Sequence, residues 1–229
     1  MPTFDRADTT WGITPDLIDI ANVAVERIAV RKASVVPVRD IKGHTIGGLI
    51  RTYLQAHIRR MLTFIQAGCA EIAAGRSLVT NQCVRAIYEN VACVCDYADQ
   101  IIPMLEKREF QNVADFASAR AFATRLEHLI DKHGPSNTST SILTQIDKMV
   151  RRHPGYREAY DHLSEIVHPN GLGAVVYYVK LEDGRASIFD DGLDPSKAKE
   201  SLIVAATLLL FAEASIAEIE TKLATLYEN

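Results

Sequence analysis

His168 is the residue of this chain whose type and position best suit acid–base chemistry. It ends the segment YREAYDHLSEIVH and is followed by Pro169, which disfavours the α region in the residue before it. We therefore expect His168 to lie where a helix ends and the chain turns extended. The helix dipole favours a protonated imidazole at that end. His168 in this position can donate a proton or contact a phosphate, and it can equally cap the helix by binding its last carbonyl groups.

The helix predicted from Tyr156 to Val167 has an apolar and a polar face. At 100° per residue, tyrosine, leucine, isoleucine and valine side chains share one arc, and part of the opposite arc is a polar stripe about 60° wide that ends at His168. A stripe of this kind faces either solvent or a site. We take Arg157 as a candidate catalytic cation. The candidate binding residues on this helix and just after it are Asp161, His162, Ser164 and Asn170.

A second polar line is predicted on the helix that begins at Ser77. Arg85 and Glu89 are four residues apart and can form an ion pair, with Asn81 and Asp96 near the same line. On a solvated face such a pair contributes only a few tenths of a kcal/mol. Inside a bundle, beside the stripe of His168, it would join a buried polar network of the kind that often marks a functional centre. Arg85 is a candidate catalytic cation and Glu89 a candidate binding residue, and both environments remain open.

Potential metal ligands do not form a recognised pattern. Glu165 and His168 have the Glu-x-x-His spacing of di-metal carboxylate bundles, but those sites need the motif twice, and it occurs once. The four cysteines lack the two-residue spacing of a zinc knuckle. We expect no metal and no cofactor, and we interpret the cysteines as buried reduced thiols, which suits a reducing cytoplasm.

The elements that must position these residues are mostly helices. Apolar residues recur at helical spacing over 16–32, 45–74, 77–103, 110–133, 142–151, 156–167 and 195–226. Between the last two, AVVYYVKL and ASIF flank Asp183 and Gly184, which predicts a β-hairpin whose turn needs positive φ. We predict a mainly α fold, a single helical-bundle domain over 1–229 with one hairpin at about 174–189 before the last helix.

Composition narrows the class of protein. The chain has 229 residues, 48% of them hydrophobic, and a net charge of -4, which indicates a folded protein without a global attraction to nucleic acid or anionic lipid. Locally, Glu26 to Arg60 holds eight basic and two acidic residues, whereas Glu182 to Glu228 holds ten acidic and four basic ones. These faces could steer a polyanion or pair two subunits, or they could be solvated surfaces. No signal peptide is apparent, and the longest apolar run, from Leu202, is too short to cross a bilayer, so we expect a cytoplasmic location without a membrane.

Two segments resemble a broad group of uncharacterised bacterial helical proteins. LVTNQCVRAIYENVACV carries the Arg-x-x-x-Glu helix of that group, and YDHLSEIVHPNG, before the hairpin, carries its Leu-Ser-x-x-Val-His-Pro segment. The group is distantly similar to the HEPN superfamily, helical bundles of toxin and antiviral defence systems. Many HEPN proteins are dimeric, metal-independent ribonucleases. The resemblance therefore implies a helical bundle, a homodimer and RNA as substrate or ligand.

The HEPN catalytic pattern is an arginine, four to six residues, then a histidine. Arg157 with His162, and Arg51 with His57, fit this spacing, but no arginine stands at that distance before His168. Cleavage of RNA without a metal needs a base near the 2′-hydroxyl, an acid for the leaving oxygen and a cation for the phosphorane charge. The resemblance implies His168 as acid or base and Arg85 or Arg157 as the cation.

Three functional hypotheses follow. The first is an HEPN-like protein of a toxin or defence system that binds RNA or cleaves it without a metal. The alternative is a non-catalytic helical module that binds a protein partner, in which the polar motif is structural. The third is a small-molecule pocket among Tyr88, Arg85, Glu89 and His168. No phosphate-binding glycine loop, nucleophile elbow or dinucleotide fingerprint indicates a common enzyme class, and a single site requires Arg85, Glu89 and His168 to converge.

Overall fold

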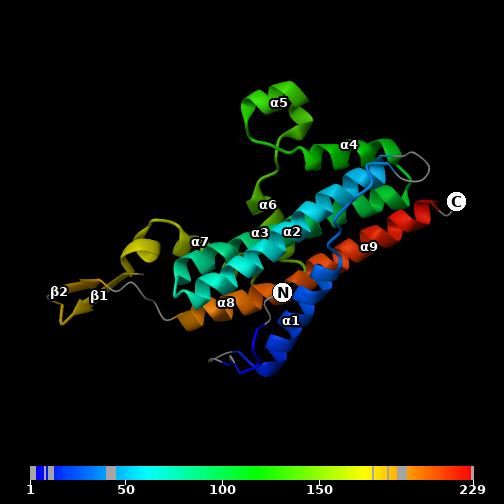
Figure 1. The fold of residues 1–229 in the computed structure, drawn as a ribbon. Helices are drawn as coiled ribbons and strands as arrows, with labels where there is room; N and C mark the ends of the chain where they lie inside the picture. Colours follow the sequence, from blue (N-terminus) through cyan, green and yellow to red (C-terminus); the bar gives the residue numbers. More distant parts are fainter. Residues whose placement is uncertain are drawn as a thin grey trace.

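The computed structural model describes residues 4–7, 9, 13–39, 45–176, 178–184, 186–189 and 195–227. Over these residues the chain is a mainly α-helical bundle with a two-stranded antiparallel hairpin before the last helices (Figure 1). The predicted fold class is confirmed. The elements in chain order are α1 (Pro15–Val30), α2 (Ile46–Ala73), α3 (Ser77–Glu106), α4 (Phe110–Ala121), α5 (Glu127–His133), η1 (Pro135–Asn137), α6 (Ile142–Met149), α7 (Tyr156–Val167), η2 (Gly171–Val176), β1 (Val179–Glu182), β2 (Ala186–Phe189), α8 (Pro195–Thr207) and α9 (Leu209–Tyr227).

Helix α3 lies at the centre of the bundle. It contacts α2, α4, α6, α7, α8 and α9, and its buried residues, such as Val91, Ala92 and Tyr97, lie all round its circumference. A helix that is apolar on every side is stable only when neighbours cover all of it. The predicted end at Pro103 is too early, because this proline is exposed and the helix runs on to Glu106. The polar side chains carried by α3 therefore meet residues from several parts of the chain.

Helices α8 and α9 form the apolar end of the chain that was predicted as one helix. A turn at Leu208 separates them, where the N–H of Leu208 bonds to the carbonyl oxygen of Ala205. Within the described residues, Ser196–Thr225 is long and apolar enough to cross a membrane by length and composition, although 56% of its most apolar window is buried inside the bundle. The buried helix of a bundle core passes the same test, and Leu202, Ile216 and Leu223 are fully buried here.

The predicted helix over 110–133 is interrupted. Helix α4 ends at Ala121, and α5 begins only at Glu127. Between them Thr124 forms a parallel bridge with Thr138: its N–H donates to the carbonyl oxygen of Asn137 at 2.8 Å, and its own carbonyl accepts from Ser139 at 3.0 Å. These backbone bonds replace the helical ones that the residues around Thr124 would otherwise make. The short helix α5 consequently stands away from the bundle (Figure 1).

The hairpin turn forms as predicted, but the first strand is shorter. Asp183 and Gly184 have φ values of 48° and 67°, the positive angles that the sequence predicts for the turn. Strand β1 begins at Val179 rather than at about 174, because Gly171–Val176 forms a π-helical turn instead. The N–H of Ala174 bonds to the carbonyl oxygen of Asn170, which commits this stretch to a helical path.

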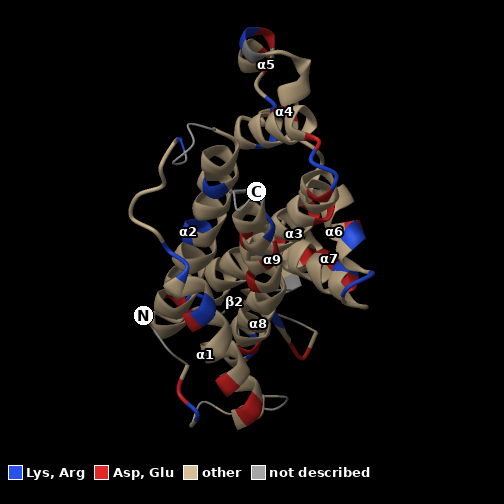
Figure 2. Cartoon of the chain, turned by 90° about the vertical axis from the view of Figure 1, so that its right-hand side faces the viewer, with Lys and Arg blue, Asp and Glu red and all other residues tan. Residues whose placement is uncertain are grey.

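Part of the charge asymmetry of the sequence is neutralised within the fold. Arg31, just after α1, pairs with Glu213 (Nη2–Oε1, 2.5 Å) and Glu220 (Nη1–Oε2, 2.6 Å) of α9. Arg27 lies 3.8 Å from Glu213. Figure 2 shows the acidic positions of α9 near the basic positions of α1 and α2. The basic and acidic segments therefore meet each other at the junction of α1 and α9.

Candidate functional site

His168 lies at the end of α7, as predicted. Helix α7 ends at Val167, and His168 takes an extended conformation (φ -75°, ψ 145°) before the proline. Its backbone N–H still donates to the carbonyl oxygen of Ser164 at 2.9 Å, and the residue is exposed. Among the described residues, no hydrogen bond or ion pair joins its imidazole to another side chain.

The turn after His168 is closed by its own residues. The side-chain amide of Asn170 donates to Glu165 Oε2 at 2.5 Å, and its Oδ1 accepts from the N–H of Gly173 at 2.9 Å. Asn170, a candidate binding residue, is therefore a clamp between the end of α7 and η2. In the described part of the chain, no group of three or more histidine, cysteine or acidic side chains gathers as metal ligands would.

Arg157 belongs to an ion-pair network at the surface. Its guanidinium lies 2.8 Å from Asp161 Oδ2 and 2.5 Å from Asp147 Oδ1. The hydrogen bond to Asp161, and to a smaller extent that to Asp147, raises the pKa of Arg157. Asp161 is consequently a partner of Arg157 within the chain. His162 is exposed on the same helix, and a separation of five residues turns it about 140° away from Arg157. The structure therefore does not bring the two residues of this arginine–histidine pattern together.

Arg85 and Glu89 form a closed triad with Tyr160 of α7. The hydroxyl of Tyr160 donates to Glu89 Oε1 at 2.9 Å and accepts from Arg85 Nη2 at 3.2 Å, while Arg85 Nε lies 3.3 Å from the same Glu89 oxygen. The guanidinium carbon of Arg85 also stands 5.4 Å from the centre of the Tyr160 ring. Burial and the hydrogen bond to Glu89 raise the pKa of Tyr160, and the hydrogen bond from Arg85 opposes them.

The three side chains expected to converge do not share a contact. Among the described residues, no hydrogen bond or ion pair links His168 to the Arg85–Glu89–Tyr160 triad. The hydroxyl of Ser164, between Tyr160 and His168 on α7, is buried and has no hydrogen-bond partner among the described residues. Tyr160 belongs to the apolar arc of the predicted helix. Arg85 and Glu89 therefore bond to a residue on the core-facing side of α7 and not to its polar stripe.

Asp96, which the sequence analysis places near the line of Arg85 and Glu89, is the centre of a separate polar cluster whose partners on α4 and α6 were not predicted. Its side chain is 1% exposed and accepts from Arg120 Nη2 of α4 at 3.0 Å and Lys148 Nζ of α6 at 2.6 Å. Gln145 of α6 adds an amide at 3.4 Å and accepts from the thiol of Cys93 at 3.0 Å. A charged residue within the buried run around Asp96 was the available signal, because a buried carboxylate requires cationic partners.

His57 of α2 is half-buried and contacts α3. Its Nδ1 lies 2.9 Å from Asn90 Oδ1, which also accepts from Arg60 Nε at 3.2 Å. The amide nitrogen of Asn90 donates to the carbonyl oxygen of Ala86, so the oxygen faces His57, and Nδ1 is the protonated nitrogen. Burial lowers the pKa of His57 to about 4; the hydrogen bond to Asn90 opposes this shift, and the charge of Arg60 adds to it.

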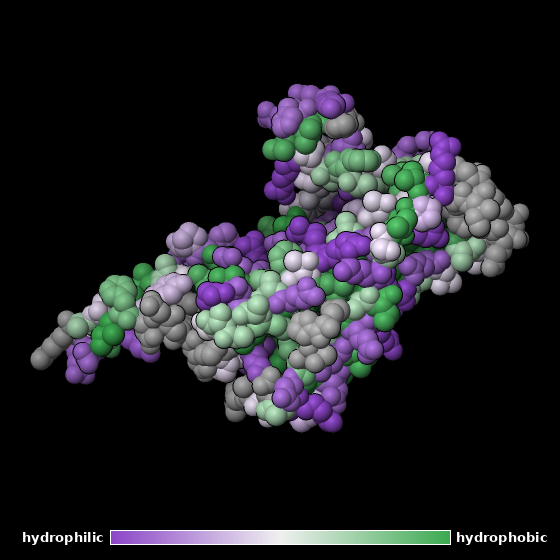
Figure 3. Space-filling view, in the orientation of Figure 1, coloured by the Kyte–Doolittle hydropathy of each residue, from purple (hydrophilic) through white to green (hydrophobic). Residues whose placement is uncertain are grey.

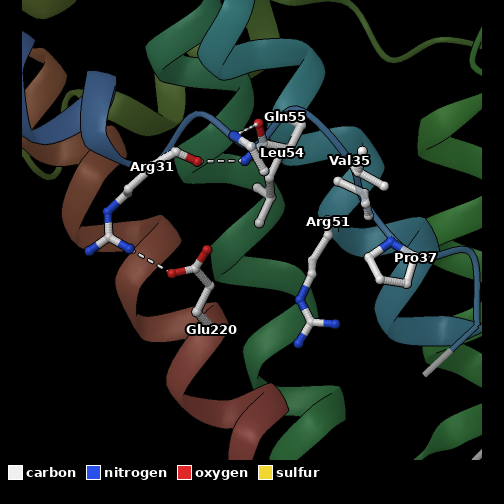
Figure 4. Close-up of a pocket in the computed structure, with 9 residues that line it drawn as sticks. Arg31, Val35, Pro37, Arg51, Leu54, Gln55 and Glu220 are labelled. Atoms are coloured by element: carbon white, nitrogen blue, oxygen red, sulfur yellow. Dashed lines mark hydrogen bonds and ion pairs between the residues drawn. The ribbon is translucent and has the colours of Figure 1, made fainter. Parts of the chain in front are cut away.

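Arg51 lines a cavity of about 130 Å³ between α2, α9 and the chain that follows α1 (Figure 4). Arg31, Gln55 and Glu220 also line it, and Gln55 connects α2 to the chain after α1: its amide donates to the carbonyl oxygen of Arg31 at 2.7 Å and its Oε1 accepts from the N–H of Ala33 at 2.9 Å. Arg51 and His57 therefore lie in different surroundings, Arg51 at this cavity and His57 beside Asn90. Arg51 lines this cavity, whereas none of the candidate catalytic and binding residues between Arg85 and Asn170 does.

The four cysteines are free thiols, two buried and two half-buried. Burial raises the pKa of each, and that of Cys93 to about 12, so they remain protonated near neutral pH.

A comparison of the chain with protein-family models finds no match, and comparisons with curated proteins and with solved structures find no significant match.

The arrangement as a whole provides three separate polar groups on α3. The Arg85–Glu89–Tyr160 triad joins α3 to α7, the Asn90 group joins it to α2, and the Asp96 cluster joins it to α4 and α6. In each group an acceptor on α3 receives hydrogen bonds from a neighbouring helix. Asn90 and Asp96 are buried, whereas the side chains of Arg85 and Glu89 are 25% and 30% exposed. Buried polar groups that are satisfied in this way, as in the Asn90 and Asp96 groups, fix the register of the packed helices.

Proposed function

We propose that this protein is a non-catalytic helical module that acts by associating with protein, and that its polar motifs hold the helices in register. The observation that carries the proposal is the distribution of the three candidate catalytic side chains. Arg85 is bound to Glu89 and Tyr160, Arg157 is bound to Asp147 and Asp161, and His168 stands exposed beyond the end of α7. Acid–base catalysis requires its groups to reach one reacting centre, and this distribution does not supply one.

Cleavage of RNA is the competing proposal, and it predicts a dependence on His168. We would incubate the purified protein with labelled single-stranded and hairpin RNA at neutral pH in the presence of EDTA. The expected result is no cleavage above that of a preparation made in parallel from cells lacking the protein. His168→Ala should behave like the wild type.

His128→Ala is the matched control, because it removes another exposed histidine, on α5, that belongs to no candidate site. Cleavage by the wild-type protein that is lost in H168A and retained in H128A would overturn the proposal in favour of a ribonuclease. Equal cleavage by all three proteins and by the parallel preparation would identify a contaminant and agree with the proposal.

A further inference from the structure

The β-hairpin extends from the bundle as an arm. In Figure 1 it lies at the far left, beyond the ends of α7 and α8. Three of the four residues of β1 and all four of β2 are exposed. Among the described elements, the arm contacts only the η2 turn that leads into it. An isolated two-stranded hairpin is at best marginally stable in water, and further strands stabilise it, so an arm of this kind favours the addition of strands from a partner.

The arm has one apolar face. In the observed register Val179 lies opposite Phe189 and Leu181 opposite Ser187, whereas Lys180 lies opposite Ile188. Because side chains alternate along a strand, Val179, Leu181 and Phe189 share one face. Leu181 is 74% and Phe189 77% exposed, and Figure 3 shows apolar, green side chains at the surface of this arm. A large exposed apolar surface on a projecting element is typical of an interaction site.

The outer edge of β1 is self-complementary. If β1 meets a second β1 in antiparallel orientation, centred on Leu181, then Leu181 faces its own copy. Lys180 of each strand then faces Glu182 of the other, which gives two opposite-charge pairs. Moving the centre to Lys180 or to Glu182 would place two like charges directly opposite each other, an arrangement that destabilises a sheet.

We propose that the arm pairs two copies of this chain, edge to edge through β1, about a two-fold axis at Leu181. This inference rests on the proposed function as an association module. The pairing makes a four-stranded sheet in the order β2, β1, β1, β2, with Val179, Leu181 and Phe189 of both copies on one face, since residues directly opposite in an antiparallel pair share a face. An interface of this type is isologous, as in most homodimers.

A second copy fits this edge better than the alternatives within the arm. Strand β2 has the sequence ASIF and offers no charged pair that would select a register. On β1, by contrast, the order is Lys180, Leu181, Glu182. A two-fold axis at Leu181 therefore produces the pair of Lys180 and Glu182 twice, once on each side of the axis. Charge complementarity of this kind specifies register and partner more than it adds affinity.

The test measures molecular mass by sedimentation over a range of protein concentrations. The wild type should show a concentration-dependent dimer. Lys180→Glu and Glu182→Lys each replace two attractive pairs by two repulsive ones, so each should raise the dimer dissociation constant by about tenfold or more. The double variant K180E/E182K restores both pairs and should dimerise like the wild type. An equimolar mixture of the two single variants should form a mixed dimer, because every pair in it is again of opposite sign.

Lys107→Glu is the control for net charge, since Lys107 is exposed at the end of α3, outside the arm. It should dimerise normally. Far-ultraviolet circular dichroism should be the same for all variants, because every substitution is at the surface. A wild type that remains monomeric at the highest concentration, or a dimer that neither single variant weakens, would overturn the inference. Such a result without RNA cleavage leaves the proposed association module intact, whereas cleavage dependent on His168 removes the proposal on which the inference rests.

Discussion

The ammonium of Lys148 lies 2.6 Å from the carboxylate of Asp96, which is itself almost completely buried. The two residues come from different helices, α6 and α3, and Arg120 of α4 approaches the other carboxylate oxygen at 3.0 Å. Helices α4 and α6 are short, and most of the described residues between them are exposed. The Asp96 cluster therefore anchors both helices on α3 by charge in addition to apolar packing.

Replacing Asp96 by Asn should destabilise the protein strongly. The variant leaves the charges of Arg120 and Lys148 without the carboxylate that compensates them, and breaking one side of a buried ion pair typically costs about 3 kcal/mol or more. We expect the midpoint of urea unfolding to fall with an unchanged m value.

Asp99→Asn provides the matched control for this prediction. Asp99 of α3 pairs with Arg152 in the turn that follows α6, but the side chain of Asp99 is 49% exposed, so the variant should lose no more than about 1 kcal/mol. Equal losses for D96N and D99N would show that the Asp96 cluster is not an anchor.

Local signals explain which parts of the structure could be predicted from the sequence. Pro169 sets the end of α7 because a proline restricts the residue before it, and Asp183–Gly184 sets the hairpin turn because few other residues accept positive φ. Both features depend on neighbours within a few residues. Helical periodicity likewise located the long helices, which depend on apolar faces of the same segment.

Contacts between distant segments could not be predicted in the same way. Tyr160 meets Glu89 across 71 positions of sequence, and Lys148 meets Asp96 across 52. A helical wheel separates Tyr160 from the polar stripe because the wheel gives only the direction of each side chain around one helix. It does not show which residues of a neighbouring helix pack against that face. The polar stripe of α7 itself carries the surface pairs of Arg157, and its Ser164 hydroxyl is buried.

His57 should make the stability depend on pH between about 4 and 6.5. Its pKa is lowered to about 4 in the folded protein by burial, whereas the unfolded value is about 6.5. Between these values the unfolded chain binds more protons, so stability rises with pH there and does not change above about pH 7 on account of this group. We expect a loss of about 2 kcal/mol on going from pH 7.5 to pH 5.

The measurement is urea unfolding of the wild type and His57→Asn at pH 7.5, 6 and 5. Asn does not titrate, and its amide can donate to Asn90 as the imidazole Nδ1 does. The difference in unfolding free energy between the two proteins should therefore shrink as the pH falls. A difference that stays constant across this range would contradict the assignment of a His57 that is neutral in the folded protein.

Gly173→Ala should disrupt the turn that follows α7. A Cβ at this position would lie closer than 3.0 Å to the carbonyl oxygens of Ile166 and His168, backbone atoms that cannot move without opening the end of the helix. The N–H of Gly173 would also lose its bond to Asn170. We expect a loss of about 1 to 3 kcal/mol, the usual range for an overpacked site, and faster hydrogen exchange at the end of α7.

Gly171→Ala tests the same turn without the clash, because no atom lies within 4 Å of a Cβ placed there. Its stability should stay within about 0.5 kcal/mol of the wild type. If G173A and G171A had equal, small effects, close packing would not explain the HPNGLG segment, and a role for His168 outside the fold would gain weight. A large effect of G173A alone would instead show that the glycine-rich turn and Pro169 have a structural role. They would hold the hairpin on the bundle, since the turn leads directly from α7 through η2 into β1.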